Sequence, residues 1–241
     1  MTGLRIALIG YGKMGKTIRQ IAELRGHSID MIIDVDQEHN LDDLDNGKID
    51  VAIEFTRPEA AFANISACIK KSIPVISGTT GWLDKFEEIK YLCNEHRGSF
   101  FYASNYSIGV NIFFEINRQL AKLMNNFTEY NIEMEEIHHT QKLDAPSGTA
   151  ITLAEGIIAE VSRKNNWVNR ETVEESSIGI ISKRIDDVPG THTISYKCAI
   201  DDIEIKHTAH TRQGFATGAV IAAEWLVNKK GCFGMKDLLE F

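Results

Sequence analysis

A short apolar run that ends in a glycine-rich turn restricts the fold of this chain more than any other feature. Residues 4–10, LRIALIG, are typical of a buried strand, and GYGKMG at residues 10–15 follows directly and opens a stretch of helical period. In such a G-x-G-x-x-G turn, the glycines permit a tight turn, close approach of a pyrophosphate, and close packing of helix on strand. The alternative is a glycine-rich turn that binds nothing. We favour a dinucleotide-binding turn made of these residues: Gly10, Tyr11, Gly12, Lys13, Met14 and Gly15.

The first half of the chain alternates short β-rich apolar runs with longer helical stretches, which is the pattern of βαβ units in a parallel sheet. Strands are expected at residues 4–10, 28–34, 50–56, 73–79 and 99–105. Helices are expected at residues 13–25, 58–71 and 83–96, with a polar connection at 37–48.

The pattern changes from about residue 108, where helices and alternating strands no longer follow a regular order. The expected elements are a helix at 109–124, a strand at 131–139, a helix at 148–163 and a helix at 214–229. The runs HTISYKCA and IEIKHTAH flank Asp201-Asp202 and predict an antiparallel hairpin. A parallel sheet followed by a mixed or antiparallel one predicts an α/β protein of two domains, with boundaries near residues 106 and 212.

Composition and charge exclude several classes of protein. The chain is 43% hydrophobic and 25% charged, as in ordinary globular proteins. A net charge of -8 without a long Lys/Arg run argues against partners such as nucleic acid or an anionic membrane. The cysteines are scattered with no CxxC pair, so we expect reduced thiols, a cytoplasmic location and no metal site. The N-terminal apolar run is too short for a membrane span and has no signal-peptide pattern.

A carboxylate ends the second expected strand. Asp34 lies about 20 residues beyond the glycine turn, where an acidic residue can accept hydrogen bonds from both ribose hydroxyls of a dinucleotide. Its charge would repel the 2′-phosphate of NADP, and the following residues 35–38, VDQE, include no Arg or Lys. We therefore favour NADH as the cofactor. NADPH is the lesser alternative, which Lys13 at the glycine turn would support.

Two further turns lie at the carboxyl ends of expected strands. GTTG at residues 78–81 has hydroxyls and bare backbone that could face a nicotinamide, but by itself it is more typical of a plain turn with a Thr cap. EFTRPEA at residues 54–60 places Thr56 and Pro58 where a helix begins, so a capping role is the simpler interpretation.

Residues 136–150, EIHHTQKLDAPSGTA, gather several reactive groups in one run. His138 and His139 lie at the end of an expected strand, where neighbouring side chains point to opposite faces. Both can reach one ligand only if the chain turns there. Histidine suits proton transfer, and Lys142 adds a positive charge nearby. Taken alone, each of these residues would more often be structural or solvated.

The residues that follow favour a binding site. Ser147, Gly148 and Thr149 precede a helix whose apolar residues recur at helical spacing. The unpaired N–H groups and positive dipole end of that helix, with two hydroxyls and a bare backbone, fit a carboxylate. With a dinucleotide turn upstream, this predicts a proton donor beside a receptor for a small acid, and hydride transfer coupled to protonation.

The same stretch strongly resembles the signature of the dihydrodipicolinate reductases, also called 4-hydroxy-tetrahydrodipicolinate reductases, of lysine and diaminopimelate biosynthesis. The likeness covers nearly the whole chain. It also includes these blocks, in the order of the family: GYGKMG, IEFTRPEA, VISGTTGW, ASNYSIGVN and HTRQGFATGAVIAAEWL.

The resemblance implies a Rossmann-like dinucleotide domain of residues 1–106 and 212–241, and an α+β domain of residues 107–211 for substrate binding and tetramerisation. It implies reduction of a small cyclic dicarboxylate by NADH or NADPH in a homotetramer. His138 would be the general acid/base, and Lys142 a second proton donor or charge stabiliser. The substrate carboxylates would be held by His139, Lys142, Ser147, Gly148 and Thr149.

The resemblance also assigns residues around the cofactor. Phe55 would lie near it, and Arg212 with Phe215 would form the hinge between the domains. The nicotinamide would be lined by Gly78, Thr79, Thr80, Ala103, Ser104, Asn105 and Tyr106. The chain departs from the family pattern in a shorter stretch after Asp34, and in carrying Glu54 and Ser104 where Asp and Pro are common.

Two other functions are compatible with a dinucleotide fold. An aspartate-type dehydrogenase would share the glycine turn, but the HH…K…PSGT signature argues against it. A dinucleotide-sensing protein would have kept the fold and lost the chemistry, and it would have no need for His138 and Lys142 beside a carboxylate site.

Overall fold

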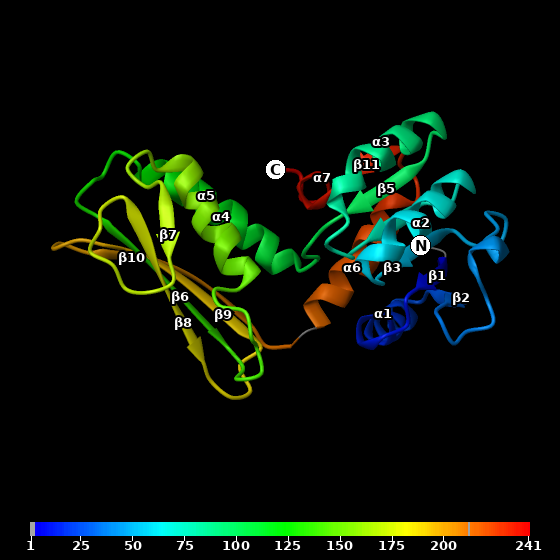
Figure 1. The fold of residues 1–241 in the computed structure, drawn as a ribbon, viewed down its shortest axis with the longest axis horizontal. Helices are drawn as coiled ribbons and strands as arrows, with labels where there is room; N and C mark the ends of the chain where they lie inside the picture. Colours follow the sequence, from blue (N-terminus) through cyan, green and yellow to red (C-terminus); the bar gives the residue numbers. More distant parts are fainter. Residues whose placement is uncertain (1–2, 212) are drawn as a thin grey trace. The chain divides into compact units, whose positions relative to one another are not determined.

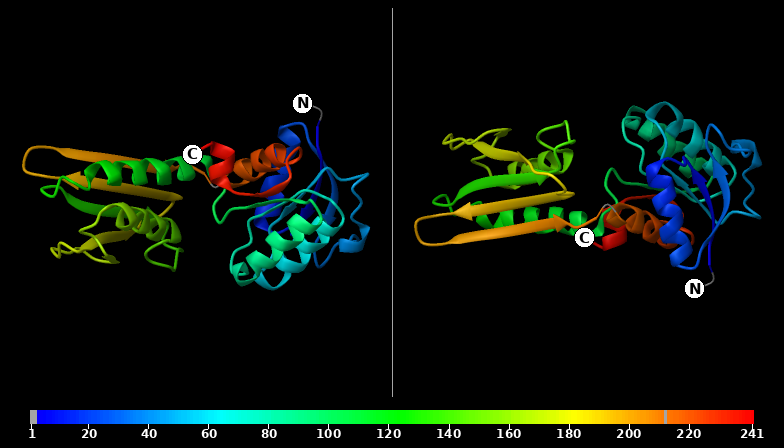
Figure 2. Two further views of the ribbon diagram at one scale, coloured as in Figure 1. Left: turned by 90° about the horizontal axis from the view of Figure 1, so that it is seen from above. Right: turned by 90° about the horizontal axis from the view of Figure 1, so that it is seen from below.

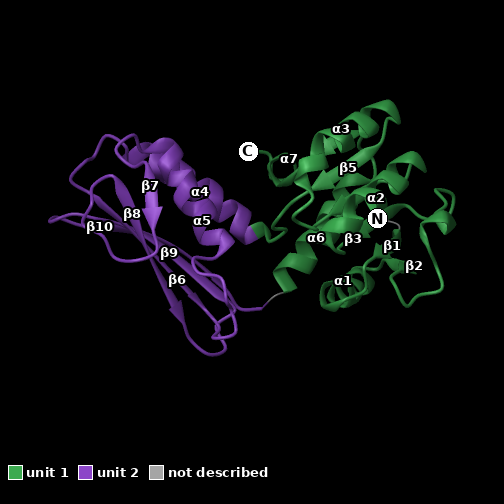
Figure 3. Cartoon of the chain, in the orientation of Figure 1, with its two compact units in different colours: residues 1–108, 213–241 green, residues 109–212 purple. Residues whose placement is uncertain are grey.

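The computed structural model describes residues 3–211 and 213–241, and they form two compact units. The first unit comprises residues 1–108 and 213–241, and the second comprises residues 109–212 (Figure 3). The expected hinge residue Arg212 lies outside the described residues. The chain therefore leaves the first unit once and returns to it, so the first unit is discontinuous in sequence.

The first unit is built on a parallel sheet of six strands in the order β11-β5-β4-β3-β1-β2. The chain passes from β1 to β2 on one side and then to β3 on the other, so the order reverses between β1 and β3. Open α/β sheets bind ligands at such a reversal. The strands are β1 (Arg5–Ile9), β2 (Ser28–Ile33), β3 (Val51–Glu54), β4 (Val75–Ser77), β5 (Ser99–Tyr102) and β11 (Gly231–Phe233).

Helices cover both faces of this sheet (Figure 2). Because side chains alternate along a strand, Ile6 and Leu8 of β1 pack with α1 and α6, whereas Ala7 and Ile9 pack with α2 and α3. Burial on both faces explains why these strands are apolar throughout. The helices are α1 (Lys13–Leu24), α2 (Pro58–Lys70), α3 (Phe86–Glu95), α6 (Gln213–Leu226) and α7 (Met235–Leu239), with short 3-10 turns η1 (Leu41–Asp43) and η2 (Leu83–Lys85).

The second unit holds a mixed sheet of five strands in the order β10-β9-β6-β8-β7. Strand β6 is parallel to β8, and β8 to β7, while β9 is antiparallel to both β6 and β10. The strands are β6 (Asn131–His138), β7 (Asn166–Val168), β8 (Ser177–Arg184), β9 (Gly190–Lys197) and β10 (Asp202–Ala209).

Helices α4 (Ile108–Met124) and α5 (Gly148–Glu160) pack on the same face of the mixed sheet (Figure 1). Along β6, Ile132 and Met134 are buried in the core shared with these helices. Glu133 and Glu135 alternate with them and line a broad polar hollow on the other face. The period of two in β6 thus sends even-numbered side chains toward α4 and α5, which is how Glu136 and His138 come to be buried.

The α/β architecture with a parallel and a mixed sheet is confirmed, and several element boundaries differ from expectation. Strands β7, β8 and β11 were not predicted: β7 and β11 have three residues each, and β8 carries Gly179 and charged residues that hide its alternation. The expected helix 83–96 begins as the 3-10 turn η2, and the helix expected to run to residue 229 ends at Leu226 before β11. No helix of the described residues is long and apolar enough to cross a membrane.

Candidate active site

The glycine turn after β1 forms one wall of a pocket at the carboxyl ends of β1, β2 and β3. Gly10 has φ +94°, and a Cβ there would lie 2.1 Å from the carbonyl oxygen of Phe55. A Cβ on Gly15 would lie 2.3 Å from the carbonyl oxygen of Gly10, whereas one on Gly12 would meet nothing within 4 Å. The fold therefore needs Gly10 and Gly15, and Gly12 leaves its space open for a ligand.

Asp34 lies in the same pocket, oriented by the backbone around it. One carboxylate oxygen accepts the N–H of Tyr11, and the other accepts the N–H of Val35 at 2.7 Å. The remaining lone pairs can accept ribose hydroxyls. The sequence has no basic residue directly after Asp34, but the fold brings Arg57 to this pocket. Lys13 is exposed at the first position of α1.

Glu54 organises the turns beside this pocket. Its carboxylate is fully buried at the end of β3 and accepts hydrogen bonds from the hydroxyls of Thr56, Ser77 (2.6 Å) and Thr79 (2.9 Å). Thr56 was expected to cap α2, but the N-cap is Arg57 and the Thr56 hydroxyl turns to Glu54 instead. The expected Thr cap of the GTTG turn is absent for the same reason, since Thr79 also serves Glu54.

The remaining residues expected at the cofactor directly follow the carboxyl ends of β4 and β5, except Phe55, which follows β3. The ring of Phe55 lies so close to Gly78 that a Cβ there would approach it to 2.1 Å. Tyr106 is buried, and its hydroxyl donates to the carbonyl of Ser77 at 2.8 Å. Among the other expected residues, Ala103 is buried, Asn105 is half-buried, and Thr80 and Ser104 are exposed.

In the second unit, β6 ends at His138, so the adjacent histidines separate. His138 is 8% exposed and faces the interior beneath α5. His139 lines a different hollow with residues 140–141 and 186–189. The expected roles of both histidines at the substrate stay predictions. Of the two, only His138 lies in the buried group near Ser147.

Helix α5 begins beside His138. Its N-cap is Ser147, whose hydroxyl accepts the N–H of Ala150 at 3.2 Å. Gly148 is exposed, and a Cβ on it would meet nothing within 4 Å. Thr149 is half-buried in the first turn. The helix start is therefore open at Gly148, with N–H groups and the positive dipole end available to an anion.

The turn between β6 and α5 is held by Arg184 of β8. Its guanidinium donates to the carbonyl oxygens of Asp144 at 2.6 Å and Lys142 at 3.2 Å. The ammonium of Lys142 lies 2.8 Å from both oxygens of the Asp144 carboxylate and lowers the pKa of that group. Lys142 thus carries a charge at the helix start that is already shared with an exposed partner.

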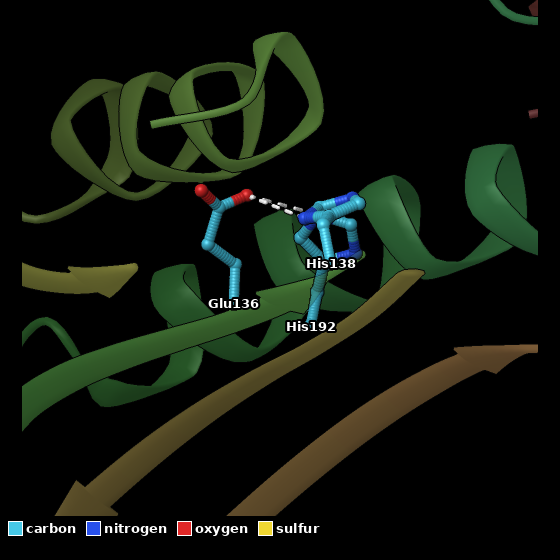
Figure 4. A group of neighbouring side chains, drawn as sticks. All are labelled: Glu136, His138 and His192. Atoms are coloured by element: carbon cyan, nitrogen blue, oxygen red, sulfur yellow. Dashed lines mark ion pairs between the residues drawn. The ribbon is translucent and has the colours of Figure 1, made fainter. Parts of the chain in front are cut away.

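A buried group of ionisable side chains completes the site: Glu136, His138 and His192 of β9 (Figure 4). Oε2 of Glu136 lies 3.2 Å from Nδ1 of His138 and 3.7 Å from Nε2 of His192. Burial, followed by the charge of His138, lowers the pKa of His192 to about 4, so His192 is neutral at pH 7. Burial by itself would raise the pKa of Glu136, but the close contact with His138 and the hydrogen bond from Ser147 outweigh it and hold the pKa below its ordinary value.

These three side chains present ligand atoms within 4.8 Å of one another, as in a metal site. The donor set is small, and the other oxygen of Glu136 already faces the guanidinium of Arg184 at 3.3 Å. A positive side chain so close supplies the counter-charge that a cation would bring. The expectation that the chain has no metal site stays a prediction.

Five residues of the two sites were not assigned a role from the sequence. Glu54 and Glu136 stand within quoted motifs, and their position on the inward face of a strand was the signal that could have identified them. Arg57 and His192 also stand within quoted runs and Arg184 does not, but all three reach the sites from strands that are distant in the chain, which no local pattern indicates.

Comparison with known proteins places both units in one family. The family model described as "Dihydrodipicolinate reductase, N-terminus" matches residues 4–106, and the model described as "Dihydrodipicolinate reductase, C-terminus" matches residues 109–239. The chain belongs to the dihydrodipicolinate reductase family. Membership of this reductase family excludes an aspartate-type dehydrogenase as the identity of the chain.

Relatives of the dihydrodipicolinate reductase family match this chain from end to end. A 4-hydroxy-tetrahydrodipicolinate reductase of Christiangramia forsetii is 52% identical over 236 residues, 98% of each chain. One of Lawsonia intracellularis is 37% identical over 264 residues, covering 98% of this chain and 99% of its own. The structure of a dipicolinate-bound dihydrodipicolinate reductase from Paenisporosarcina sp. TG-14 superposes with a TM-score of 0.75 at 22% identity, covering 98% and 99% of the two chains. That likeness extends the family assignment to the fold.

Proposed function

We propose that this chain reduces 4-hydroxy-tetrahydrodipicolinate to tetrahydrodipicolinate in the biosynthesis of diaminopimelate and lysine. In the balanced reaction, the substrate, a reduced nicotinamide cofactor and a proton give the product, the oxidised cofactor and water. The observation that carries this proposal is the 52% identity, over 98% of both chains, to a relative of that name. The signature stretch supports it, because it joins a buried imidazole to an open helix start in one unit.

The first unit fits a dinucleotide. Gly12 leaves open space at the start of α1, and Asp34 presents an oriented carboxylate at the same pocket. When bound there, the dihydronicotinamide supplies the hydride. We propose NADH as the preferred form, because Asp34 favours free ribose hydroxyls and repels a 2′-phosphate. Arg57 in the pocket keeps NADPH as an alternative.

The second unit fits a cyclic dicarboxylate. One carboxylate would rest on the N–H groups and hydroxyls of Ser147, Gly148 and Thr149, with the charge of Lys142 beside it. His138 would give its proton to the ring carbon next to the one that receives the hydride. His139 is proposed to hold a carboxylate as well, which from its separate hollow requires the substrate to extend past the end of β6.

The decisive experiment follows NADH absorbance with enzymatically generated 4-hydroxy-tetrahydrodipicolinate. Steady consumption of NADH that depends on this compound is expected. A dinucleotide-sensing protein would instead bind NADH and leave its absorbance unchanged, and that result would refute the proposed function. Running the assay with NADPH at matched concentrations tests the cofactor preference, because a higher kcat/KM with NADPH would contradict it.

His138→Gln should lower kcat at least about 100-fold, since general acid catalysis contributes about that much. NADH binding, followed by fluorescence, should not change, because the dinucleotide pocket is lined by residues of the other unit. Turnover within about threefold of wild type would remove His138 from the role of proton donor.

We further propose that the protein is a homotetramer assembled through the second unit. The face of its sheet that α4 and α5 leave uncovered is a polar hollow lined by alternating charges, including a Lys197–Glu133 ion pair of 2.7 Å. Light scattering should give a mass of about four times 27.0 kDa. A monomeric mass under assay conditions would contradict this.

A further inference from the structure

Glu136 has two oxygens that serve two different parts of the site. Its side chain is fully buried on β6. Oε1 accepts the backbone N–H of Ser147 at 3.0 Å and lies 3.3 Å from Nη2 of Arg184. Oε2 faces the imidazoles of His138 and His192 (Figure 4). A single carboxylate thus joins the start of α5 to the imidazole expected to donate the proton.

The contact with His138 determines which ring nitrogen carries hydrogen. Nδ1 of His138 and Oε2 of Glu136 are both buried, and neither forms a hydrogen bond with any of the described residues, including each other. Their separation is 3.2 Å. An ionised carboxylate only accepts hydrogen bonds, so a lone pair on Nδ1 would face a negative oxygen, whereas an N–H at Nδ1 would be stabilised. The arrangement therefore favours hydrogen on Nδ1.

The other ring nitrogen of His138 is then left for chemistry. Nε2 lies on the side of the ring that faces Gly190 of β9, where a glycine backbone stands close to it. A Cβ on Gly190 would approach Nε2 to 3.1 Å, so the glycine keeps a side chain from crowding that nitrogen. The two ring nitrogens of His138 thus have different neighbours, a carboxylate at Nδ1 and a glycine backbone at Nε2.

We propose that Glu136 is a positioning residue that holds His138 with hydrogen on Nδ1 and Nε2 toward the substrate, and that fixes the start of α5 through Ser147. Only the role of Nε2 as proton donor rests on the proposed function; the contacts of Glu136 with His138 and Ser147 do not depend on it. The imidazolium gives its Nε2 proton to the substrate ring and becomes the neutral Nδ1–H form, which Glu136 already accommodates. A proton from solvent then returns to Nε2. No rotation of the ring is needed between turnovers.

The isosteric variant Glu136→Gln separates the two functions of the carboxylate. Both neighbours of Oε1, the Ser147 N–H and the Arg184 guanidinium, are donors, so the amide oxygen will take that position. The amide NH2 then faces the imidazoles and donates to Nδ1 of His138. The helix start keeps its hydrogen-bond acceptor. His138, however, is forced into the Nε2–H form, which carries its lone pair on Nδ1 and so reverses the arrangement of the wild type.

Nitrogen-15 NMR of the histidine rings tests this in the full-length protein without substrate. The neutral ring of His138 in the wild type should show the shifts of the Nδ1–H form, and in Glu136→Gln those of the Nε2–H form. The His138→Gln variant assigns the signal. The Nε2–H form in the wild type, or the same form in both proteins, would overturn the proposal.

Kinetics give a second and independent result. Glu136→Gln should lower kcat about 10- to 100-fold, as expected for loss of a correctly arranged proton donor, with KM for the substrate within about threefold of wild type. Glu136→Ala should also raise KM, because the Ser147 N–H loses its acceptor. A purely structural role predicts equal losses in both variants, accompanied by lower thermal stability of Glu136→Gln, and that outcome would contradict the positioning role.

Glu129→Gln is the matched control. Glu129 is exposed in the turn between α4 and β6, outside both the candidate site and the proposed interface. It should change neither the His138 signals nor kcat. If the wild type fails to consume NADH with this substrate while the NMR result holds, the proposed function is wrong and the positioning role of Glu136 stands. Normal turnover by Glu136→Gln in an active preparation would refute the positioning role alone.

A metal ion is the competing occupant of the cluster, and dialysis distinguishes it. Wild-type protein treated with EDTA should keep full activity, and one equivalent of Zn²⁺ should not raise it. Loss of activity with EDTA and recovery with Zn²⁺ would show that Glu136, His138 and His192 bind a cation, and would overturn the proposal.

Discussion

The three glycines of the turn after β1 illustrate how different the reasons for one residue type can be. A Cβ added to Gly10 or Gly15 would lie 2.1 or 2.3 Å from a backbone carbonyl oxygen, so the fold excludes any side chain at these two positions. Gly12 has open space around it. That space is open to a ligand, and the packing of the fold does not require a glycine there.

Gly12→Ala should therefore leave the melting temperature unchanged and raise KM for NADH about tenfold, which corresponds to roughly 1.4 kcal/mol of lost binding. Gly15→Ala should instead destabilise the protein by about 1–3 kcal/mol, because the added methyl group displaces packed backbone. Thermal melts and steady-state kinetics on both variants check this. Equal destabilisation by the two substitutions would contradict the assignment of Gly12 to the ligand.

Arg57 is the residue through which the structure modifies the expectation about cofactors. It lies in the pocket that holds Asp34, although the two residues follow different strands and no local pattern connects them. A guanidinium can pair with a 2′-phosphate through charge-assisted hydrogen bonds.

Arg57→Ala should lower kcat/KM for NADPH about tenfold or more, since a hydrogen bond to a charged group contributes about 1.5–3 kcal/mol. The same variant should change kcat/KM for NADH by less than about threefold. Lys70→Ala, at the far end of α2, removes an equal charge and should affect neither cofactor. Equal losses with both cofactors would show that Arg57 does not discriminate between them.

At the scale of elements, the start of α5 has a structural role and, in the proposed function, a binding role. Ser147 caps the helix through the N–H of Ala150, and its own N–H is held by Glu136. The same turn presents Gly148 to an incoming anion. A helix start that is held in place by Glu136 and open at Gly148 is suited to a carboxylate, because its N–H groups need no rearrangement to bind one.

Ser147→Ala should cost about 1 kcal/mol of stability through loss of the cap and should raise KM for the substrate. Thr152→Ala is the control on the same helix: its hydroxyl donates to the carbonyl of Gly148 and caps nothing, so both quantities should remain close to wild type. Urea unfolding and substrate titration give the two numbers. An unchanged KM in Ser147→Ala, despite lower stability, would show that Ser147 caps the helix and does not contribute to substrate binding.

At the scale of the molecule, the buried cluster couples stability to pH. The pKa of His192 is lowered to about 4 from 6.5 by burial first and then by the charge of His138. The unfolded chain therefore binds more protons than the folded one between those values, so stability is complete above pH 6.5 and is lost as pH falls toward 4. Glu136, with its pKa below the ordinary value, acts in the same direction at still lower pH.

The second unit should lose up to about 3 kcal/mol of its free energy of unfolding between about pH 6.5 and 4 through His192. His192→Gln should flatten this dependence, whereas His39→Gln, which removes an exposed histidine of the first unit, should not. The other charged groups acting on His192 are Glu136, His207 and Lys142. Urea titrations at several pH values, followed by the fluorescence of Trp167, measure the slope. An identical slope in His192→Gln would exclude His192 as its source.

Much of the architecture follows from local spacing. The alternation of apolar strands and helices predicted the parallel sheet, and the period of two around Asp201 predicted the β9–β10 hairpin. Short elements escaped prediction because three residues, as in β7 and β11, contain too little periodicity to be distinguished from a loop. The pairing of β11 with β5, which returns the end of the chain to the first unit, depends on a contact across more than half the sequence.

By itself, the sequence determined the glycine turn, the carboxylate at Asp34 and the run from His138 to Thr149, because each depends on neighbours a few positions apart. Only the tertiary structure decided that Glu136 lies beside His138 and Ser147, that Arg184 and His192 are its other neighbours, and that Arg57 lines the same pocket as Asp34. Those contacts arise where strands distant in the chain pair side by side. Their geometry is set by the packing of whole sheets and helices, and no local spacing encodes it.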